Sequence, residues 1–247
     1  MGLDVISLGE ALIDFISLKS GVSLEEAPGF EKCPGGAPAN FAVACARLGL
    51  STGFIGKVGN DAFGRFLVAT LAENRVDVSQ VKYSEHRTAL AFVSIAKNGE
   101  RHFMFYRRPC ADVMLEEADL DPGYISHARV LHFGTVSLSE SPSREATLRA
   151  VQYARDSGVQ VSFDPNIRFH LWAKGEGEIR EEVISVARKC DIFLPSEEEA
   201  RFLSGKDVKA SLAEFLSWGP RTVAIKLGER GCIAADRDGI IEAPGIR

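Results

Sequence analysis

The sequence lacks the signatures of the commonest nucleotide-binding and hydrolytic sites. It contains no GxxxxGKS/T phosphate loop, no protein-kinase set of glycine-rich loop, HRD and DFG, no HExxH and no GxSxG. Its five cysteines are scattered singly, without a CxxC pair. These absences exclude the P-loop, protein-kinase, zinc-protease and serine-hydrolase designs, and a zinc site is not expected.

Long hydrophobic runs and an excess of positive charge are missing as well. No apolar stretch approaches the ~20 residues that cross a membrane, and no basic segment followed by an apolar one opens the chain. The net charge is −5, and no block of Lys or Arg stands out. Neither nucleic acid nor a membrane is therefore an expected partner. Single thiols indicate a reducing compartment, so the sequence predicts a cytoplasmic protein.

Short apolar runs alternate with helical patterns along most of the chain. Strand-like runs lie at residues 5–8, 53–56, 130–133, 159–163, 192–194 and 222–227. Helical patterns lie at residues 39–48, 63–71, 144–156, 180–189 and 197–203. This alternation predicts a mainly parallel sheet with helices on both faces.

One region breaks this rhythm. Two apolar runs, residues 88–95 and 101–106, flank Asn98-Gly99, which is typical of a β-hairpin. Residues 11–17 also read as extended. We expect these segments to form a separate small sheet.

Gly35 and Gly36 stand in the strongest local motif, Pro-Gly-Gly-Ala-Pro-Ala-Asn over residues 34–40, directly before an alanine-rich helix. A glycine pair lets backbone amides approach a ligand, a helix N-terminus favours oxygen-rich groups, and Asn40 offers both a donor and an acceptor. A sugar hydroxyl would suit this motif. A plain loop into a helix, with Pro38 in the first turn, explains it equally well.

Polar residues also follow several predicted strands. Asp14 lies between Ile13 and Phe15, and Arg168 ends the run Asp-Pro-Asn-Ile-Arg over residues 164–168. Ligands of open α/β sheets bind beyond the carboxyl ends of strands, and Arg can hold phosphate oxygens bidentately. An exposed edge residue and an Asp-Pro turn are the plain alternatives.

Two further segments have similar double interpretations. Ser196 and Glu199 fit a helix capping box, and Glu199 could also order water around a magnesium ion. Lys226 and the turn that follows it, residues 227–231, could line a nucleotide or form only a hairpin.

Taken in order, these motifs resemble the ribokinase-like (PfkB) carbohydrate kinases over essentially the whole chain. The stretch from residue 21 to residue 40 and the run Phe105-Tyr106-Arg107 are similar to the fructokinase branch. The resemblance implies a Rossmann-type three-layer α/β/α domain over residues 1–247 with a small β-sheet lid, its strands near residues 11–17 and 88–106. It implies an ATP- and Mg²⁺-dependent kinase that acts on a small sugar, with K⁺ as a further candidate ion and a homodimer through the lid as one option.

The resemblance also implies the site residues. Sugar binding falls to Asp14, Gly35, Gly36, Asn40, Tyr106, Arg107 and Arg168, and Arg168 is in addition the expected catalytic residue. ATP binding falls to Asn166, Ser196, Lys226, Gly228 and Gly231. Indirect metal binding falls to Glu199.

Two departures from the family pattern follow. The family's Asn-x-x-Glu element has Ser196 in place of its Asn. The Gly-Ala-Gly-Asp element, which supplies an anion hole and the catalytic base, does not occur up to Arg247, so we expect the base beyond that residue, the C-terminal part of the fold to be missing, and these residues alone to have little activity. Fructose is the expected substrate. 2-Keto-3-deoxygluconate, ribose or another sugar of the family, or a binding module without catalysis, remain open, and Arg107 and Arg108 suit an acidic sugar.

Overall fold

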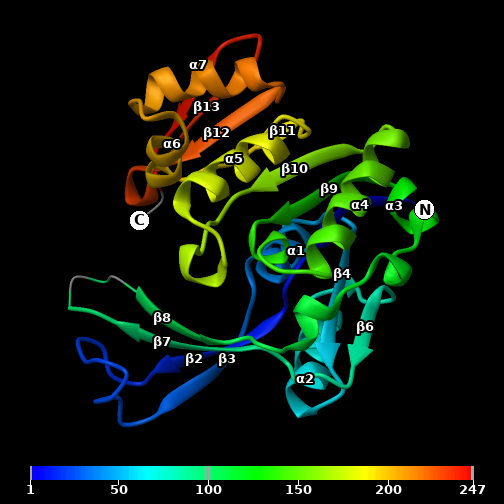
Figure 1. The fold of residues 1–247 in the computed structure, drawn as a ribbon, viewed down its shortest axis with the longest axis vertical. Coiled ribbons are helices and arrows are strands. Elements are labelled where there is room, and N and C mark those ends of the chain that lie inside the picture. Colours follow the sequence, from blue (N-terminus) through cyan, green and yellow to red (C-terminus); the bar gives the residue numbers. More distant parts are fainter. Residues whose placement is uncertain (1, 98, 100, 246–247) are drawn as a thin grey trace.

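The main sheet gives the molecule its frame. A computed structural model describes residues 2–97, 99 and 101–245. The strands of this sheet are β1 (Leu3–Leu8), β4 (Thr52–Gly59), β5 (Val76–Asp77), β6 (Val81–Ser84), β9 (Ala128–Gly134), β10 (Gln160–Asp164), β11 (Ile192–Phe193), β12 (Thr222–Lys226), β13 (Cys232–Ala235) and β14 (Ile240–Ala243). Their order is β14-β13-β12-β11-β10-β9-β1-β4-β5, and β6 pairs with β4 (Figure 1). Pairing is parallel from β5 to β12 and antiparallel beyond it.

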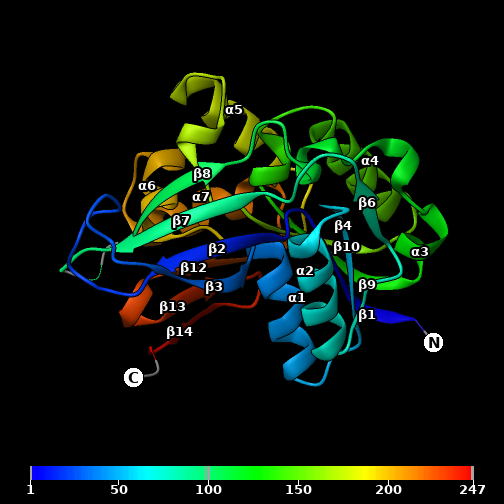
Figure 2. The same ribbon diagram turned by 90° about the horizontal axis from the view of Figure 1, so that it is seen from below.

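Helices cover both faces of this sheet. They are α1 (Ala37–Arg47), α2 (Ala62–Glu73), α3 (Pro122–Ser126), α4 (Ser143–Asp156), α5 (Glu176–Ala187), α6 (Glu197–Ser204) and α7 (Val208–Trp218). Short 3₁₀ turns are η1 (Ala111–Met114), η2 (Glu117–Asp119), η3 (Val136–Leu138), η4 (Phe169–Leu171) and η5 (Gly228–Arg230). In Figure 2, α1 and α2 lie on one side of the strands and α4 and α5 on the other. The predicted three-layer α/β/α fold is confirmed.

Side chains alternate along β9 between the two faces of the main sheet, and each face packs against a different layer of helices. Leu131 and Phe133 are buried in the large core that also contains the apolar faces of α4 and α5. His132, between them, points to the opposite face, where its ring stacks on Phe41 of α1 at 3.6 Å between centroids. Burial lowers the pKa of His132 to about 3, so the ring is neutral in the folded protein.

A second sheet, here called the lid sheet, projects from one end of the main sheet (Figure 1). It contains β2 (Leu12–Ser17), β3 (Phe30–Gly35), β7 (Leu90–Ile95) and β8 (Arg101–Tyr106) in the order β3-β2-β7-β8. Its central pair, β2 and β7, is parallel. The strand β3 was not predicted. Asn98 of the expected hairpin turn, and Arg247, after which the base was expected, lie outside the described residues.

No helix within the described residues is both long enough and apolar enough to cross a membrane.

Candidate active site

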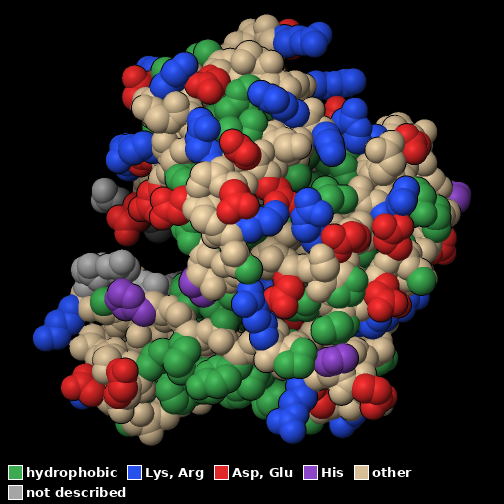
Figure 3. Space-filling model, in the orientation of Figure 1, with side chains coloured by type: hydrophobic (Ala, Val, Ile, Leu, Met, Phe, Trp, Pro, Cys, Tyr) green, Lys and Arg blue, Asp and Glu red, His purple; other side chains and the backbone are tan. Residues whose placement is uncertain are grey.

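A cavity of about 230 Å³ lies where the lid sheet meets β1 and α1. Apolar side chains of the lid sheet form one wall: Leu12, Ile16, Val93, Ile95, Phe103 and Phe105. Asp14 comes from the same strand face as Leu12 and Ile16, and the rest of the lining consists of Glu10, Gly36, Ala37, Asn40, Asn166 and Arg168, with Val136 beside them. In Figure 3 the outline of the molecule is notched between the lid sheet and the main body, and Asp and Glu side chains gather along the upper border of the notch. Apolar and hydrogen-bonding groups that line one cavity suit a small polyhydroxylated ligand.

Two adjacent glycines precede α1 beside this cavity; Gly36 lines it, whereas Gly35, predicted to bind the sugar, does not. Gly36 caps α1 with φ +99°, and a Cβ there would lie 2.3 Å from the carbonyl oxygen of Glu10. A Cβ on Gly35 would lie 2.3 Å from Oδ2 of Asp14. Only glycine therefore lets the chain turn into α1 and lets the Asp14 carboxylate lie against the backbone. The N-terminal amides of α1 and the side chain of Asn40 border the same space.

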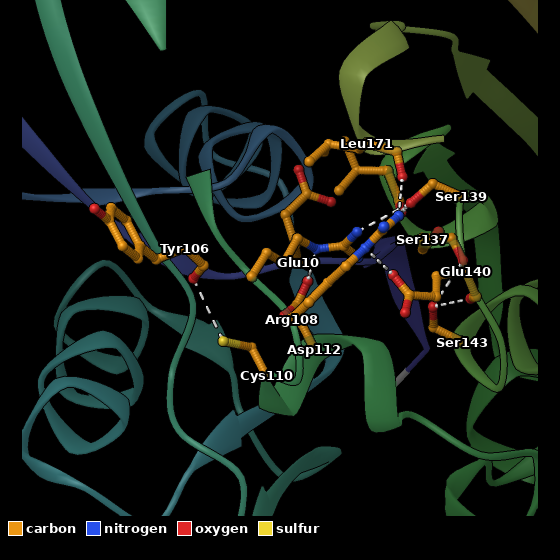
Figure 4. Close-up of polar contacts among 12 residues, drawn as sticks. Glu10, Tyr106, Arg108, Cys110, Asp112, Ser137, Ser139, Glu140, Ser143 and Leu171 are labelled. Atoms are coloured by element: carbon orange, nitrogen blue, oxygen red, sulfur yellow. Dashed lines mark hydrogen bonds and ion pairs between the residues drawn. The ribbon is translucent and has the colours of Figure 1, made fainter. Parts of the chain in front are cut away.

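Beneath the cavity lies a buried charged cluster of Glu10, Arg107 and Asp112. Arg107 Nε donates to Asp112 Oδ2 at 2.5 Å, and both side chains are almost fully buried. The same guanidinium donates to Ser139 Oγ at 3.0 Å and to the Val136 carbonyl at 3.1 Å. Figure 4 shows Glu10, Asp112 and Ser139 around this point. Arg107 thus connects the end of β8 to Asp112, Ser139 and Val136. It was predicted to contact the sugar, but it does not line the cavity.

Glu10 is the other acidic member of this cluster. Its Oε1 accepts from the Ala37 amide at 3.1 Å, in the first turn of α1, and its Oε2 is buried without a partner among the described residues. Burial raises the pKa of Glu10 to about 7. Glu10 therefore ties the end of β1 to the glycine turn at the cavity floor.

A second cavity, of about 340 Å³, adjoins the first one. It is lined by Asn166, Ile167, Arg168, Phe169, Ser196, Glu198, Glu199, Phe202 and Lys226. Asn166 and Arg168 line both cavities. The Arg168 guanidinium lies 5.4 Å from the centre of the Phe103 ring on the lid sheet. A group bound in either cavity therefore meets the same guanidinium at the boundary.

The charges in the second cavity come from the ends of β10 and β12. Lys226 Nζ forms an ion pair with Asp164 Oδ2. Burial raises the pKa of Asp164 above its ordinary value, although the Lys226 ammonium opposes this effect. Lys226 is partly exposed, so its ammonium can also face an anion in the cavity.

Ser196 and Glu199 form the capping box of α6, as their spacing predicted. Ser196 Oγ accepts from the Glu199 amide at 3.2 Å, and Glu199 Oε2 accepts from the Ser196 amide at 2.7 Å. Glu199 Oε1 accepts from the Ile167 amide at 2.7 Å. Both carboxylate oxygens therefore accept from backbone amides, and each keeps a lone pair that a magnesium-bound water could use. Among the described residues no group of three His, Cys, Asp or Glu could hold a metal ion directly.

Besides Gly35 and Arg107, three predicted site residues line neither cavity. Tyr106 is 56% exposed and lines a groove on the opposite face of the lid sheet, and in Figure 4 its ring points away from Glu10. Strand alternation is the reason, since Phe105 on the same strand faces the cavity. Gly228 and Gly231 lie in the turn after β12 but line neither of the two cavities.

Several residues that line the cavities were not predicted as site residues from the sequence. Phe103 and Phe105 belong to the lid wall, and Glu10 links the end of β1 to α1. The alternation of residues 101–106 placed both phenylalanines on one face. It did not say which face meets the main sheet.

The whole described site lies inside a segment that matches a known family. Residues 3–247 match the profile described as "pfkB family carbohydrate kinase". The chain is 46% identical over 237 residues to fructokinase-1 of Oryza sativa subsp. japonica, which covers 95% of this chain and 73% of the rice protein.

Two solved structures show the same architecture. A fructokinase from Xylella fastidiosa with bound ATP has a TM-score of 0.87 and 31% sequence identity. The match covers 100% of this chain and 75% of the Xylella chain. A fructokinase double mutant from Vibrio cholerae O395, with fructose, ADP and a potassium ion bound, has a TM-score of 0.86 and 33% identity and covers 99% of this chain and 76% of its own.

The chain belongs to the PfkB family of carbohydrate kinases. The resemblance seen in its motifs is thereby confirmed, and the protein is an ATP-dependent sugar kinase, a phosphotransferase. Fructokinases are prominent among its relatives, as the stretch over residues 21–40 suggested.

Proposed function

We propose that the protein transfers the γ-phosphoryl group of ATP to the 6-hydroxyl of D-fructose, giving D-fructose 6-phosphate and ADP. One observation carries the proposal: Asn166 and Arg168 line both a small polar-and-apolar cavity and the cavity beside it. A sugar in the first cavity and the phosphates of a nucleotide in the second would meet at Arg168. The identity to plant fructokinases supports fructose as the sugar.

The first cavity is the proposed sugar site. Asp14 and Asn40 offer an acceptor and a mixed donor and acceptor to the hydroxyls, and Gly35 and Gly36 let the ligand and the Asp14 carboxylate approach the backbone. The phenyl rings of the lid wall would exclude water from the bound sugar.

The second cavity is the proposed nucleotide site. Asn166, Ser196 and Lys226 border it, and Gly228 and Gly231 in the following turn would flank the nucleotide from outside. Phosphoryl transfer depends mainly on positioning and on stabilising charge on the phosphoryl oxygens. Arg168 and Lys226 supply positive charge on both sides of the boundary between the cavities.

Metal ions and the catalytic base are proposed without naming described residues that supply them. We propose that Mg²⁺ is required, as is usual for ATP, but no described residues are assigned to hold it. The Vibrio cholerae relative was solved with potassium bound, and a K⁺ requirement is proposed on the same terms. A carboxylate base following Arg247 stays a prediction.

The test compares acceptors under identical conditions. ADP release is measured with D-fructose, 2-keto-3-deoxygluconate, ribose and a nucleoside, and phosphorus NMR identifies the phosphorylated hydroxyl. We expect the highest kcat/KM for fructose. A higher value for another sugar overturns the substrate. Tight sugar binding by calorimetry without turnover would instead favour a binding module.

Arg168→Gln tests the shared boundary. Removing a charge-stabilising donor should lower kcat/KM by about 10²–10³-fold. Arg201→Gln is the matched control, because Arg201 is exposed on α6 and lines neither cavity. Equal activity of the two variants would contradict the role of Arg168.

We further propose that the described residues form one kinase domain with the lid sheet as its lid, working in the cytoplasm. All five cysteines, each of them described, are free thiols, which supports a reducing compartment. The outer face of the lid sheet carries an apolar groove with Met104 43% exposed and Tyr106 56% exposed. A second copy of the chain would cover it. Light scattering of Met104→Lys against the wild type tests this, and a monomeric wild type would refute it.

A further inference from the structure

Glu199 joins two segments that belong to different sides of the site. It is the third residue of α6, and its Oε2 closes the capping box with the Ser196 amide. The capping box does not account for Oε1, which accepts from the Ile167 amide in the loop after β10. One carboxylate thus fastens the nucleotide side of the site to the loop that borders the sugar side.

The loop that receives this bond needs to be held. Asn166 has φ +41°, a conformation that non-glycine residues adopt at a cost. Ile167 follows it with a buried side chain, and Arg168 comes next. Asn166 and Arg168 are the two residues that line both cavities. The Ile167 amide lies between them, so its hydrogen bond to Glu199 Oε1 restrains the backbone that carries both side chains.

We propose that Glu199 is a positioning residue that sets the conformation of residues 166–168 and thereby places Arg168 for both ligands. This inference rests on the proposed sugar kinase function and deepens it. It goes beyond an indirect magnesium role, because that role does not explain the hydrogen bond from the Ile167 amide to Oε1. Its consequence is that the residue affects sugar affinity even when neither nucleotide nor metal is bound.

The perturbation is Glu199→Gln, which keeps the size of the side chain. Its amide oxygen can still accept one N–H, whereas its amide nitrogen cannot accept the other. The matched control is Glu198→Gln, one residue away, which removes the same charge from the same cavity and leaves both hydrogen bonds intact. Thermal unfolding of both variants checks that they are folded.

The first readout is sugar binding by calorimetry without nucleotide or magnesium. We expect Glu199→Gln to weaken binding about 10-fold and to lower kcat/KM for the sugar by up to about 10²-fold, the scale of a misplacement near 1 Å. Glu198→Gln should bind the sugar as the wild type does. Unchanged sugar affinity, or a shifted magnesium requirement with unchanged sugar KM, overturns the proposal.

The second readout needs no ligand. Hydrogen exchange of the Ile167 amide should become faster in Glu199→Gln and stay slow in Glu198→Gln, because only the first variant disturbs its acceptor. If the wild type neither binds nor phosphorylates a sugar, the proposed function fails, while faster exchange would still show that Glu199 holds the loop. Unchanged exchange in Glu199→Gln overturns the positioning role whatever the substrate.

Discussion

Replacing Gly36 by alanine tests the turn at which α1 and the proposed sugar cavity both begin. The added Cβ would lie 2.3 Å from the Glu10 carbonyl oxygen and 3.1 Å from the Cα of Ala11. Both are backbone atoms, so neither can move aside as a flexible side chain would. The φ of +99° adds conformational strain of its own.

Gly49 separates these two effects. It has a similar φ of +92°, and nothing lies within 4 Å of a Cβ built on it. Gly49→Ala should therefore show the conformational term alone, about 1–3 kcal/mol of the free energy of unfolding. Gly36→Ala should lose this amount and a further 1–3 kcal/mol, roughly, for the forced backbone shift.

The assays are urea unfolding and titration with the sugar. Because the shift would occur at the cavity floor, Gly36→Ala should weaken sugar binding by about 10²-fold, whereas Gly49→Ala, at the far end of α1, should leave it unchanged. Equal losses of stability and equal sugar affinities in the two variants would refute the close approach of Gly36 to Glu10.

The remaining predictions concern the neighbours of this turn. Arg107→Met leaves Asp112 buried and unpaired and should lower the free energy of unfolding in urea by about 3–5 kcal/mol, while the double change with Asp112→Leu should recover most of it; a loss below about 1 kcal/mol for the single change would contradict this. The pKa of Glu10 is raised from 4.5 to about 7, so the folded state binds this proton more tightly and stability falls as pH rises between these values. The free energy of unfolding of Glu10→Gln, measured in urea, should therefore rise relative to that of the wild type by roughly 3 kcal/mol between pH 4.5 and pH 8. If the difference between the two free energies does not change with pH, the raised pKa of Glu10 is wrong. Gly35→Ala should push the Asp14 carboxylate aside and weaken sugar binding about 10-fold by calorimetry, with a stability change below about 1 kcal/mol; unchanged affinity would show that Asp14 does not contact the sugar.

The layers of the fold could be read from the sequence because burial enforces periodicity. Residues 63–71 show an apolar stripe at helical spacing, and they form most of α2. The strand β3 was missed because its sequence, Phe-Glu-Lys-Cys-Pro-Gly, has no apolar alternation and contains Pro34. It lies at the edge of the lid sheet, where a proline is tolerated.

The site was predictable where strand ends determine it. Arg168 follows β10 and Lys226 is the last residue of β12, and the carboxyl ends of parallel strands meet at one edge of a sheet. The role of Arg107 was not predictable, because Asp112, Ser139 and the Val136 carbonyl surround it only in the folded chain. Tertiary packing also decided on which face of the lid sheet Tyr106 lies.

The topology of the lid sheet has a consequence for how the protein folds. Its two antiparallel pairs leave the main sheet at different points of the chain, and only the parallel seam between β2 and β7 joins them. Each antiparallel pair can form from residues that are near in sequence. The pairing of β2 with β7 joins strands that are far apart in the sequence, and closing the long loop between them is slow. We expect the seam to close after the main sheet and to open first in local unfolding. A nascent chain would then have no sugar cavity until folding is complete, so that bound sugar reports the finished fold.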